Sequence, residues 1–139
     1  SKKNSQAEER VSAGSRFGGH LPASAADVKT ISVVLPCAEE RETALRTVER
    51  FCERTPPENL AEIIVVDDGS DPPLASLFAQ DERHLDQNKR CKLRLLRHEQ
   101  TIGLMAAKLA GGSSAQGDIV AFIDCHCAPQ LHWEEPIIR

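Results

Sequence analysis

The sequence lacks several features that would each identify a class of protein. Its apolar runs stay far below the roughly 20 residues that cross a bilayer, and residues 1–15 hold no apolar segment typical of a signal peptide. It also lacks an excess of basic residues, because 17 Lys and Arg face 21 Asp and Glu and give a formal net charge of −4. Nucleic-acid binders neutralise phosphates with clustered Lys and Arg, so we expect no nucleic-acid partner. A membrane tether, if there is one, is expected to lie outside this chain.

The five cysteines lack the spacing of a disulfide framework and of a zinc site. Their number is odd, and no two of them form a C-x-x-C pair. At least one thiol is therefore expected to be free or to pair outside this chain, and the redox compartment stays open. The cluster Cys125-His126-Cys127 raises a zinc hypothesis, but a structural zinc ion needs four close ligands, and the other cysteines do not supply a pair.

What the chain does contain is enough for one folded domain. It has 139 residues, of which 40% are hydrophobic and 27% are charged. One core is the expected number at this length. Residues 1–29 mix Ser, Ala, Gly and charges without periodicity, and we expect a disordered linker or stem there. The folded part is expected to span residues 30–139.

From residue 30 onward, short apolar runs alternate with segments of helical periodicity. Pro56 and Pro57 end the first predicted helix, and glycines are expected to end the third. The last run, DIVAFID, reads as a buried strand. In chain order, the predicted strands are TISVVLP, AEIIVVDD, CKLRLLRH and DIVAFID, and the predicted helices are EERETALRTVERFCERT, LASLFAQDERHL and GLMAAKLAGGSSAQG.

This alternation predicts an α/β fold with a mostly parallel sheet flanked by helices. In such sheets ligands bind beyond the carboxyl ends of the strands. Polar or turn residues follow three of the predicted strands, at 36–40, 67–70 and 124–126. We therefore expect these three loops to meet at one crevice.

Asp124 and His126 are candidate metal ligands at one of these strand ends. Side chains at positions i and i+2 point to the same side, so a carboxylate and an imidazole can reach one divalent cation. Two protein ligands suit an ion such as Mn²⁺, which keeps waters and takes oxygens from a substrate phosphate. The alternative is equally open: Asp124 caps the following turn and His126 is an ordinary surface residue.

Asp67 and Asp68 also have two interpretations. An acidic residue at a strand end can initiate an Asx turn, which Gly69 and Ser70 would complete. Alternatively, one of the two carboxylates accepts a hydrogen bond from a nucleobase N–H or a ribose hydroxyl. The spacing does not choose between the two interpretations.

Taken together, four segments of the sequence resemble the polypeptide N-acetylgalactosaminyltransferases. The resemblance covers about residues 30–139, the first half of the catalytic domain of that family, and its most specific element is the Asp-X-His-Cys run followed by a Trp. The segments are ISVVLPCAEE, EIIVVDDGSDPP, TIGLMAAKLAGG and IVAFIDCHCAPQLHWEEPII.

The resemblance implies a partial GT-A nucleotide-diphospho-sugar transferase fold and a Golgi enzyme of mucin-type O-glycosylation. Such an enzyme moves N-acetylgalactosamine from UDP-GalNAc to Ser or Thr of a protein, with Mn²⁺ and with retention at the anomeric carbon. Asp124 and His126 would bind the Mn²⁺. The donor would contact Leu35 and Pro36 beneath the base, Asp67 as the uracil partner, the backbone at Gly103, and Lys108 in place of the family's usual Arg. Cys127 would be a small buried residue or half of a disulfide.

The sequence differs from the family pattern in two places, and these differences leave alternative functions open. The family's polar Thr-Phe-His-Asn run is replaced here by residues 36–39, and its third metal ligand, a later His, is expected beyond Arg139. We therefore expect a fragment that is inactive alone, or a degenerate binder of nucleotide sugars. A phospho-receiver domain is a further alternative, with Asp124 as the phosphoacceptor and Asp67 and Asp68 holding Mg²⁺.

Overall fold

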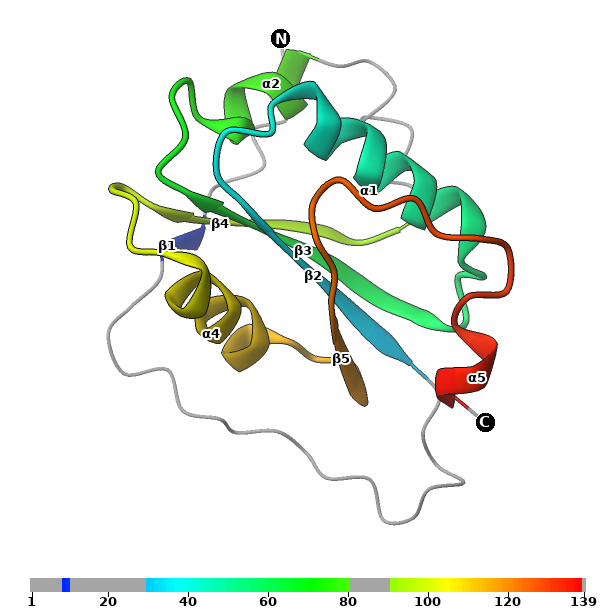
Figure 1. Cartoon of the computed structure of the whole chain (residues 1–139). Coiled ribbons are helices and arrows are strands. Elements are labelled where there is room, and N and C mark those ends of the chain that lie inside the picture. Colours follow the sequence, from blue (N-terminus) through cyan, green and yellow to red (C-terminus); the bar gives the residue numbers. More distant parts are fainter. Residues whose placement is uncertain (1–8, 11–29, 81–90, 139) are drawn as a thin grey trace, which may run out of the picture.

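The computed structural model describes residues 9–10, 30–80 and 91–138 (Figure 1). Predicted features at residues 1–8, 11–29 and 81–90, which include most of the expected linker and the end of the second predicted helix, lie outside the described residues. The elements are β1 (Glu9–Arg10), β2 (Ile31–Cys37), α1 (Glu42–Arg54), β3 (Leu60–Asp68), α2 (Leu74–Gln80), β4 (Leu93–His98), α4 (Leu104–Ser114), β5 (Ile119–Phe122) and α5 (Glu135–Ile138).

The strands form one parallel sheet in the order β1-β4-β3-β2-β5. Buried parallel strands need apolar side chains on both faces, and the apolar runs of β2 and β3 supply them. The chain steps outward from β2 to β3 and β4 and then returns to the other side of β2 as β5. β2 and β5 therefore flank the point where the strand order reverses, which is where ligands bind in open α/β sheets.

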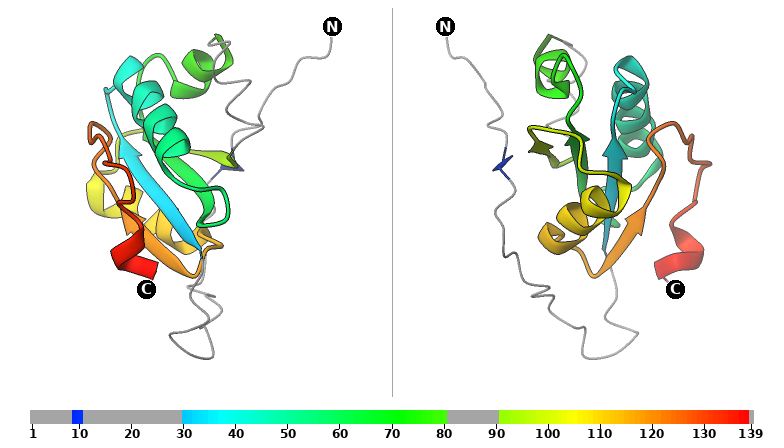
Figure 2. Two further views of the ribbon diagram at one scale, coloured as in Figure 1. Left: turned by 90° about the vertical axis from the view of Figure 1, so that its right-hand side faces the viewer. Right: turned by 60° about the vertical axis from the view of Figure 1, so that its left-hand side comes forward.

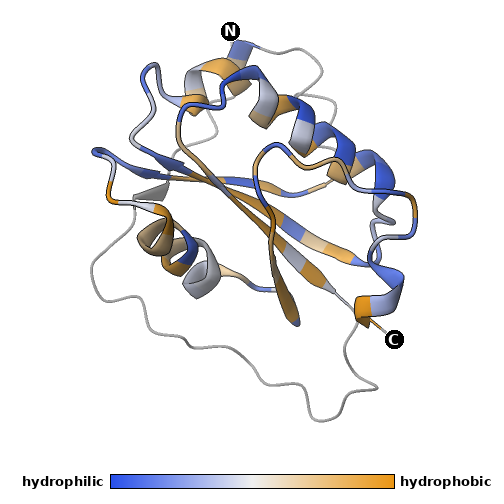
Figure 3. Ribbon diagram, viewed as in Figure 1, coloured by the Kyte–Doolittle hydropathy of each residue, from blue (hydrophilic) through white to orange (hydrophobic). Residues whose placement is uncertain are grey.

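Helices cover both faces of the sheet (Figure 2). Residues of α1 and α2, among them Phe51 and Phe78, pack on the face that carries Val33 and Val65. Ala107 of α4 packs on the opposite face, in a smaller cluster. Apolar residues lie along the strands and polar residues along the outer side of α1 (Figure 3). The predicted α/β architecture is confirmed.

The end of α4 differs from the prediction, because its glycines do not end the helix. α4 continues through Gly111 and Gly112 to Ser114. A Cβ atom at Gly111 would overlap the side chain of Val34 and lie 3.1 Å from Cγ2 of Val66. The glycine thus allows the helix to lie close against the sheet, and packing outweighs the low helix propensity of glycine.

The prediction that residues 118–124 form a buried strand is also wrong in part. β5 is a strand, but its four residues are only half-buried or exposed, and 46% of Phe122 is accessible. The reason is its place in the sheet, since β5 pairs with β2 alone among the described strands. An apolar run does not reveal whether its strand is central or at an edge.

A buried carboxylate holds the connection between α4 and β5. Glu62 of β3 is 1% exposed, and its oxygens accept hydrogen bonds from Ser32 Oγ, the N–H of Gln116 and Arg94. Arg94 also donates to the carbonyl oxygen of Ser114 at 2.8 Å. Hydrogen bonds and ion pairs of this kind offset the cost of burying the charge of Glu62. No helix among the described residues is both long and apolar enough to cross a membrane.

Candidate functional site

The carboxyl ends of β2 and β3 enclose a cavity together with the start of α4. Its volume is about 110 Å³. This is smaller than the roughly 300–1,000 Å³ of typical small-molecule sites, so the cavity can enclose only part of a nucleotide sugar. A larger hollow of about 540 Å³ lies elsewhere, at the C-terminal end of α1. The cavity is lined by Pro36, Cys37, Ala38, Glu40, Asp68, Leu104 and Ala107.

Asp68, the last residue of β3, faces this cavity and ties three segments together. Its Oδ1 accepts hydrogen bonds from His98 Nδ1 and from the N–H of Ile102, both at 2.9 Å. Its Oδ2 accepts one from the N–H of Gly103 at 2.8 Å. Because an ionised carboxylate only accepts, Nδ1 of His98 carries the proton. Burial by itself raises the pKa of Asp68, but these hydrogen bonds outweigh it, and the pKa lies below its ordinary value.

Asp67, its neighbour, is turned away from the cavity and forms a turn. Its Oδ1 accepts hydrogen bonds from the N–H and the hydroxyl of Ser70, and its Oδ2 accepts from the N–H of Leu74 at 2.9 Å and from Arg97 at 2.6 Å. The carboxylate is 3% exposed. A carboxylate has about four acceptor positions, and here all four are occupied. This is the Asx-type turn that the sequence left as one of two interpretations.

Glycines shape the backbone next to Asp68. Gly103 precedes α4 with φ 117°, and a side chain there would meet no atom within 4 Å. Gly69 has φ 75°, and a Cβ atom there would lie 2.5 Å from the N of Thr101. Only glycine adopts such angles without strain. The backbone of Gly103 therefore borders open space at the crevice, as an approaching ligand requires.

Asp124 and His126 come together just beyond β5. Both residues are exposed, and a carboxylate oxygen of Asp124, a ring nitrogen of His126 and the sulfur of Cys127 all lie within 4.8 Å of one another. Oxygen and imidazole donors at this spacing fit a divalent cation of the Mn²⁺ type, and the solvent side leaves positions for water and phosphate oxygens. The donor set thus fits the ion that the sequence predicts.

Two disulfides account for four of the five cysteines. Cys37 joins Cys125, and Cys52 joins Cys91, with Cα–Cα distances of 5.8 and 5.9 Å. The zinc hypothesis for residues 125–127 is wrong, because the Cys125 sulfur is bound to Cys37 and cannot act as a ligand. Cys127 is half-buried and free, so the prediction that it is a buried residue or half of a disulfide is also wrong. The sequence carried no signal for either pairing, because both join residues far apart in the chain.

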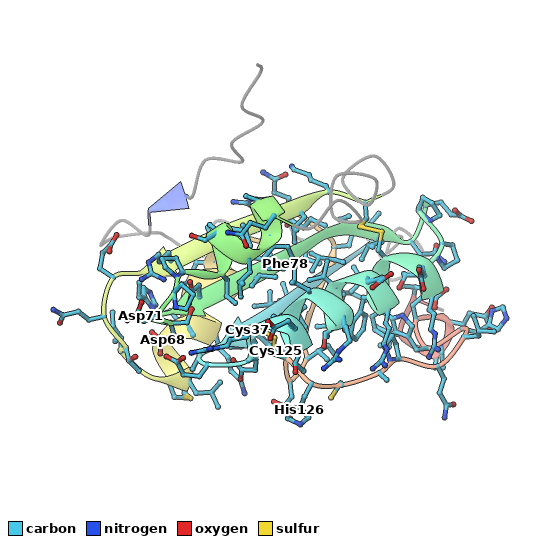
Figure 4. All side chains as sticks on the ribbon, turned by 90° about the horizontal axis from the view of Figure 1, so that it is seen from above. Cys37, Asp68, Asp71, Phe78, Cys125 and His126 are labelled. Atoms are coloured by element: carbon cyan, nitrogen blue, oxygen red, sulfur yellow. A yellow bond between two sulfur atoms is a disulfide. The ribbon has the colours of Figure 1, made fainter. Side chains whose placement is uncertain are left out.

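The segment after β5 is fastened to α1. Thr47 Oγ1 donates to the carbonyl oxygen of Cys125 at 2.6 Å, and Arg54 donates to the carbonyl oxygen of Pro129. The ring of Trp133 packs edge-to-face on Phe51 with centroids 5.3 Å apart. These contacts keep residues 124–133 against the body of the domain (Figure 4).

Comparison with known proteins decides the family. The profile of the family described as Glycosyl transferase family 2 matches residues 32–139. The chain belongs to glycosyl transferase family 2. This membership overturns the phospho-receiver alternative, and it agrees with the predicted resemblance.

Within this family, the chain is similar to polypeptide N-acetylgalactosaminyltransferases. Polypeptide N-acetylgalactosaminyltransferase 11 of Xenopus tropicalis is 35% identical over 113 residues, which are 81% of this chain and 18% of the relative. Probable N-acetylgalactosaminyltransferase 9 of Caenorhabditis elegans is 39% identical over 114 residues, which are 80% of this chain and 19% of the relative. The chain thus spans about a fifth of the length of the curated relatives it matches.

Solved structures support the glycosyltransferase fold. GalNAc-T7, solved with UDP, GalNAc and Mn²⁺, matches 81% of this chain and 21% of its own with a TM-score of 0.66 and 27% identity. The mannosyltransferase PcManGT of Pyrobaculum calidifontis, solved with GDP-Man and Mn²⁺, matches 78% of this chain and 30% of its own with a TM-score of 0.63. At 20% identity, the second match shows the fold alone.

The donor residues expected from this family's pattern do not all reach the cavity. Pro36 lines it, and Gly103 borders the crevice. Leu35 is 0% exposed in the core beneath α1, so its side chain does not face the cavity. Lys108 is half-buried on α4 and is not among the described residues that line the cavity. All acceptor positions of the Asp67 carboxylate are occupied by hydrogen bonds within the protein, whereas Asp68 lines the cavity. The resemblance to the family had pointed to Asp67 and not to Asp68.

Proposed function

We propose that this chain is the donor-binding half of a polypeptide N-acetylgalactosaminyltransferase, which transfers N-acetylgalactosamine from UDP-GalNAc to Ser or Thr of proteins with Mn²⁺. The observation that carries the proposal is the Asp124 and His126 pair, which lies beyond β5 at the reversal of strand order. The relatives at 35% and 39% identity are named as N-acetylgalactosaminyltransferases, and the GalNAc-T7 structure holds UDP, GalNAc and Mn²⁺, which supports the proposed reaction.

The metal end of the site consists of Asp124 and His126. Both side chains are exposed, so they can hold a cation while its remaining positions stay open to the diphosphate of the donor. Mn²⁺ held by these two residues would supply Lewis-acid stabilisation of the negative charge that grows on the departing UDP. The two residues hold and orient this end of the donor, and the proposal requires no covalent protein nucleophile.

The base end of the site is the cavity beside Asp68. Its Oδ1 already accepts two hydrogen bonds, but its Oδ2 accepts one, from Gly103, and so keeps one acceptor position. The N3–H of uracil is a suitable donor for that position. Asp67, which the family pattern suggests for this contact, has no acceptor position left. We therefore assign the base contact to Asp68, with Asp67 holding the turn behind it.

The proposal places the protein in the Golgi lumen. Its relatives are N-acetylgalactosaminyltransferases, and its two disulfides suit an oxidising secretory compartment.

Three further residues would contact the donor. Pro36 would lie against the base, and the open backbone at Gly103 would lie next to the nucleotide. Lys108 on α4 would contact the phosphates of the donor.

Calorimetric titration of the 139-residue chain with UDP tests the proposal. UDP binds more tightly with Mn²⁺ than without it, because both ligands share the diphosphate. His126→Ala removes this Mn²⁺ dependence. His132→Ala is the matched control and leaves the dependence intact, since His132 is also exposed but pairs with Glu135 and is not part of the group of Asp124, His126 and Cys127. Absence of UDP binding both with and without Mn²⁺ overturns the proposal.

A binder of nucleotide sugars without catalysis is the second candidate, because residues 36–39 replace the polar run that the family has after the first strand. It shares the donor site and the Mn²⁺ dependence. Transfer to a Ser/Thr peptide by a longer protein that contains this chain decides for the enzyme. Mn²⁺-dependent UDP binding without transfer by the longer protein decides for the binder.

A further inference from the structure

Cys125, which lies between the two candidate metal ligands, is fixed through both its side chain and its backbone. Its sulfur is bound to Cys37, and its carbonyl oxygen accepts the hydrogen bond from Thr47 Oγ1 at 2.6 Å. Cys37, Cys125 and Thr47 are each at most 2% exposed. The centre of the Asp124-Cys125-His126 run is therefore held from inside the protein.

The disulfide lies where the sheet stops supporting this segment. β2 and β5 pair up to Val34 and Phe122, and the last backbone hydrogen bond runs from the N–H of Ile123 to Val34 at 3.0 Å. β2 then continues to Cys37, while the chain after Ile123 leaves the sheet. The disulfide links β2 to the segment that follows β5, just beyond the point where the two segments separate. Because Cys37 also lines the cavity, the crosslink connects the wall of the base site with the metal loop.

This anchoring explains how the two ligands are presented. Cys125 is buried in the core, whereas its neighbours Asp124 and His126 are exposed to solvent. In Figure 4, Cys37 and Cys125 lie together against the body of the domain, and His126 projects away from it. Groups behind metal ligands hold the ligands in their binding orientation, and their loss typically lowers metal affinity about 10- to 100-fold.

We propose that the Cys37–Cys125 disulfide positions Asp124 and His126 for the cation and makes cation binding sensitive to the redox state. The inference rests on the proposed function, because it concerns the same metal pair. Two thiols of a monothiol reductant such as glutathione are oxidised to one disulfide, and the two electrons and two protons convert the Cys37–Cys125 bond into two thiols. The loop beyond Ile123 then keeps the Thr47 hydrogen bond but loses its covalent anchor, and Mn²⁺ binds more weakly.

The second disulfide supplies a matched control for the first test. Mn²⁺ alone is titrated into the 139-residue chain, and free Mn²⁺ is followed by electron paramagnetic resonance. The Cys37→Ala/Cys125→Ala double variant binds Mn²⁺ about 10-fold or more weakly than the native chain. The Cys52→Ala/Cys91→Ala variant, which loses the crosslink between α1 and the residues before β4, keeps the native affinity within about twofold. Circular dichroism at the titration temperature shows that each chain is folded.

A reciprocal measurement on the native chain needs no folded variant. If the disulfide strengthens Mn²⁺ binding, saturating Mn²⁺ must favour the disulfide by the same factor. The chain is equilibrated in glutathione buffers with and without Mn²⁺, and the thiols are trapped and assigned by mass spectrometry. Mn²⁺ shifts the ratio of disulfide to dithiol about 10-fold for Cys37–Cys125 and leaves Cys52–Cys91 unchanged.

The outcomes separate this inference from the proposed function. Equal Mn²⁺ affinity of the native chain and the Cys37→Ala/Cys125→Ala variant, or an unshifted Cys37–Cys125 equilibrium, overturns the inference and leaves the metal site in place. Equal weakening in both double variants also overturns it, because the effect is then one of general stability. Absence of Mn²⁺ binding by the native, oxidised chain overturns the metal assignment itself.

Discussion

The carboxylate of Asp68 accepts a hydrogen bond of 2.8 Å from the backbone N–H of Gly103, 35 residues further along the chain. This bond joins the end of β3 to the start of α4 at the rim of the cavity. The neighbouring Asp67 instead binds Ser70, Leu74 and Arg97. Two adjacent residues of the same chemistry therefore have different roles: Asp67 stabilises the turn, and Asp68 lines the candidate site.

The stability of the chain depends on pH through Asp68. Its pKa is lower in the folded protein than in the unfolded chain, so the ionised form stabilises the fold at neutral pH, and this contribution is lost as the pH falls through the folded-state pKa. This loss of stability occurs below about pH 4, which is near the ordinary pKa of Asp. We expect urea unfolding at pH 6 to show Asp68→Asn to be less stable than the native chain by about 1–3 kcal/mol. The difference narrows as the pH is lowered towards 2, and a constant difference across this range contradicts the prediction.

The remaining acceptor position of the Asp68 carboxylate also leads to a prediction about which nucleotide the site prefers. Uracil presents an N3–H donor, whereas N3 of cytosine is an acceptor, so a carboxylate favours UDP and an amide can serve CDP. Asp68→Asn lowers the ratio of UDP to CDP affinity, measured by calorimetry with Mn²⁺, by about 10-fold, the worth of roughly one hydrogen bond to a charged group. Asp67→Asn, the control, leaves the ratio unchanged because its carboxylate is already saturated. A changed ratio in Asp67→Asn alone would return the base contact to Asp67.

Two adjacent glycines of α4 respond differently to substitution by alanine. A Cβ atom at Gly111 overlaps Val34, and we expect overpacking to destabilise Gly111→Ala by about 1–3 kcal/mol. A Cβ atom at Gly112 lies 3.0 Å from the ring tip of Phe122, which is 46% exposed and can move aside. The higher helix propensity of alanine then makes Gly112→Ala neutral or stabilising by up to about 1 kcal/mol. Thermal unfolding of the two variants measures the contrast, and equal effects contradict the packing argument.

We expect the 139-residue chain alone to transfer no measurable N-acetylgalactosamine to a Ser/Thr peptide. It spans about a fifth of its relatives, and orienting the acceptor hydroxyl at the donor sugar is worth several powers of ten in rate. We expect a longer protein that contains the chain to transfer the sugar, and we expect Asp124→Ala or His126→Ala in that protein to abolish transfer. Radiolabelled UDP-GalNAc measures this. Robust transfer by the 139-residue chain alone would contradict the interpretation that it is an inactive fragment. Unchanged transfer by a longer protein that carries either substitution would contradict the assignment of Asp124 and His126 as metal ligands.

The sequence by itself determined the α/β class and the position of most elements. The runs ISVVLP and EIIVVDD are apolar and rich in β-branched residues, and α1 has helical periodicity that ends before Pro56, so local chemistry is sufficient. The convergence of polar loops at one edge follows from strand direction alone, since every strand of a parallel sheet ends on the same side. The resemblance to N-acetylgalactosaminyltransferases was likewise visible in short motifs.

Only the tertiary structure decided which groups are free to act. Asp67 and Asp68 are equivalent in the sequence. They differ because donors up to 30 positions away fill the carboxylate of Asp67, whereas the donors to Asp68, up to 35 positions away, leave it one acceptor position. The pairing of Cys37 with Cys125, 88 residues apart, depends on how β5 returns beside β2. The exposure of β5 and the place of Gly111 inside α4 also depend on neighbouring elements. Local propensity acts over a few residues, whereas saturation, pairing and burial depend on distances in space.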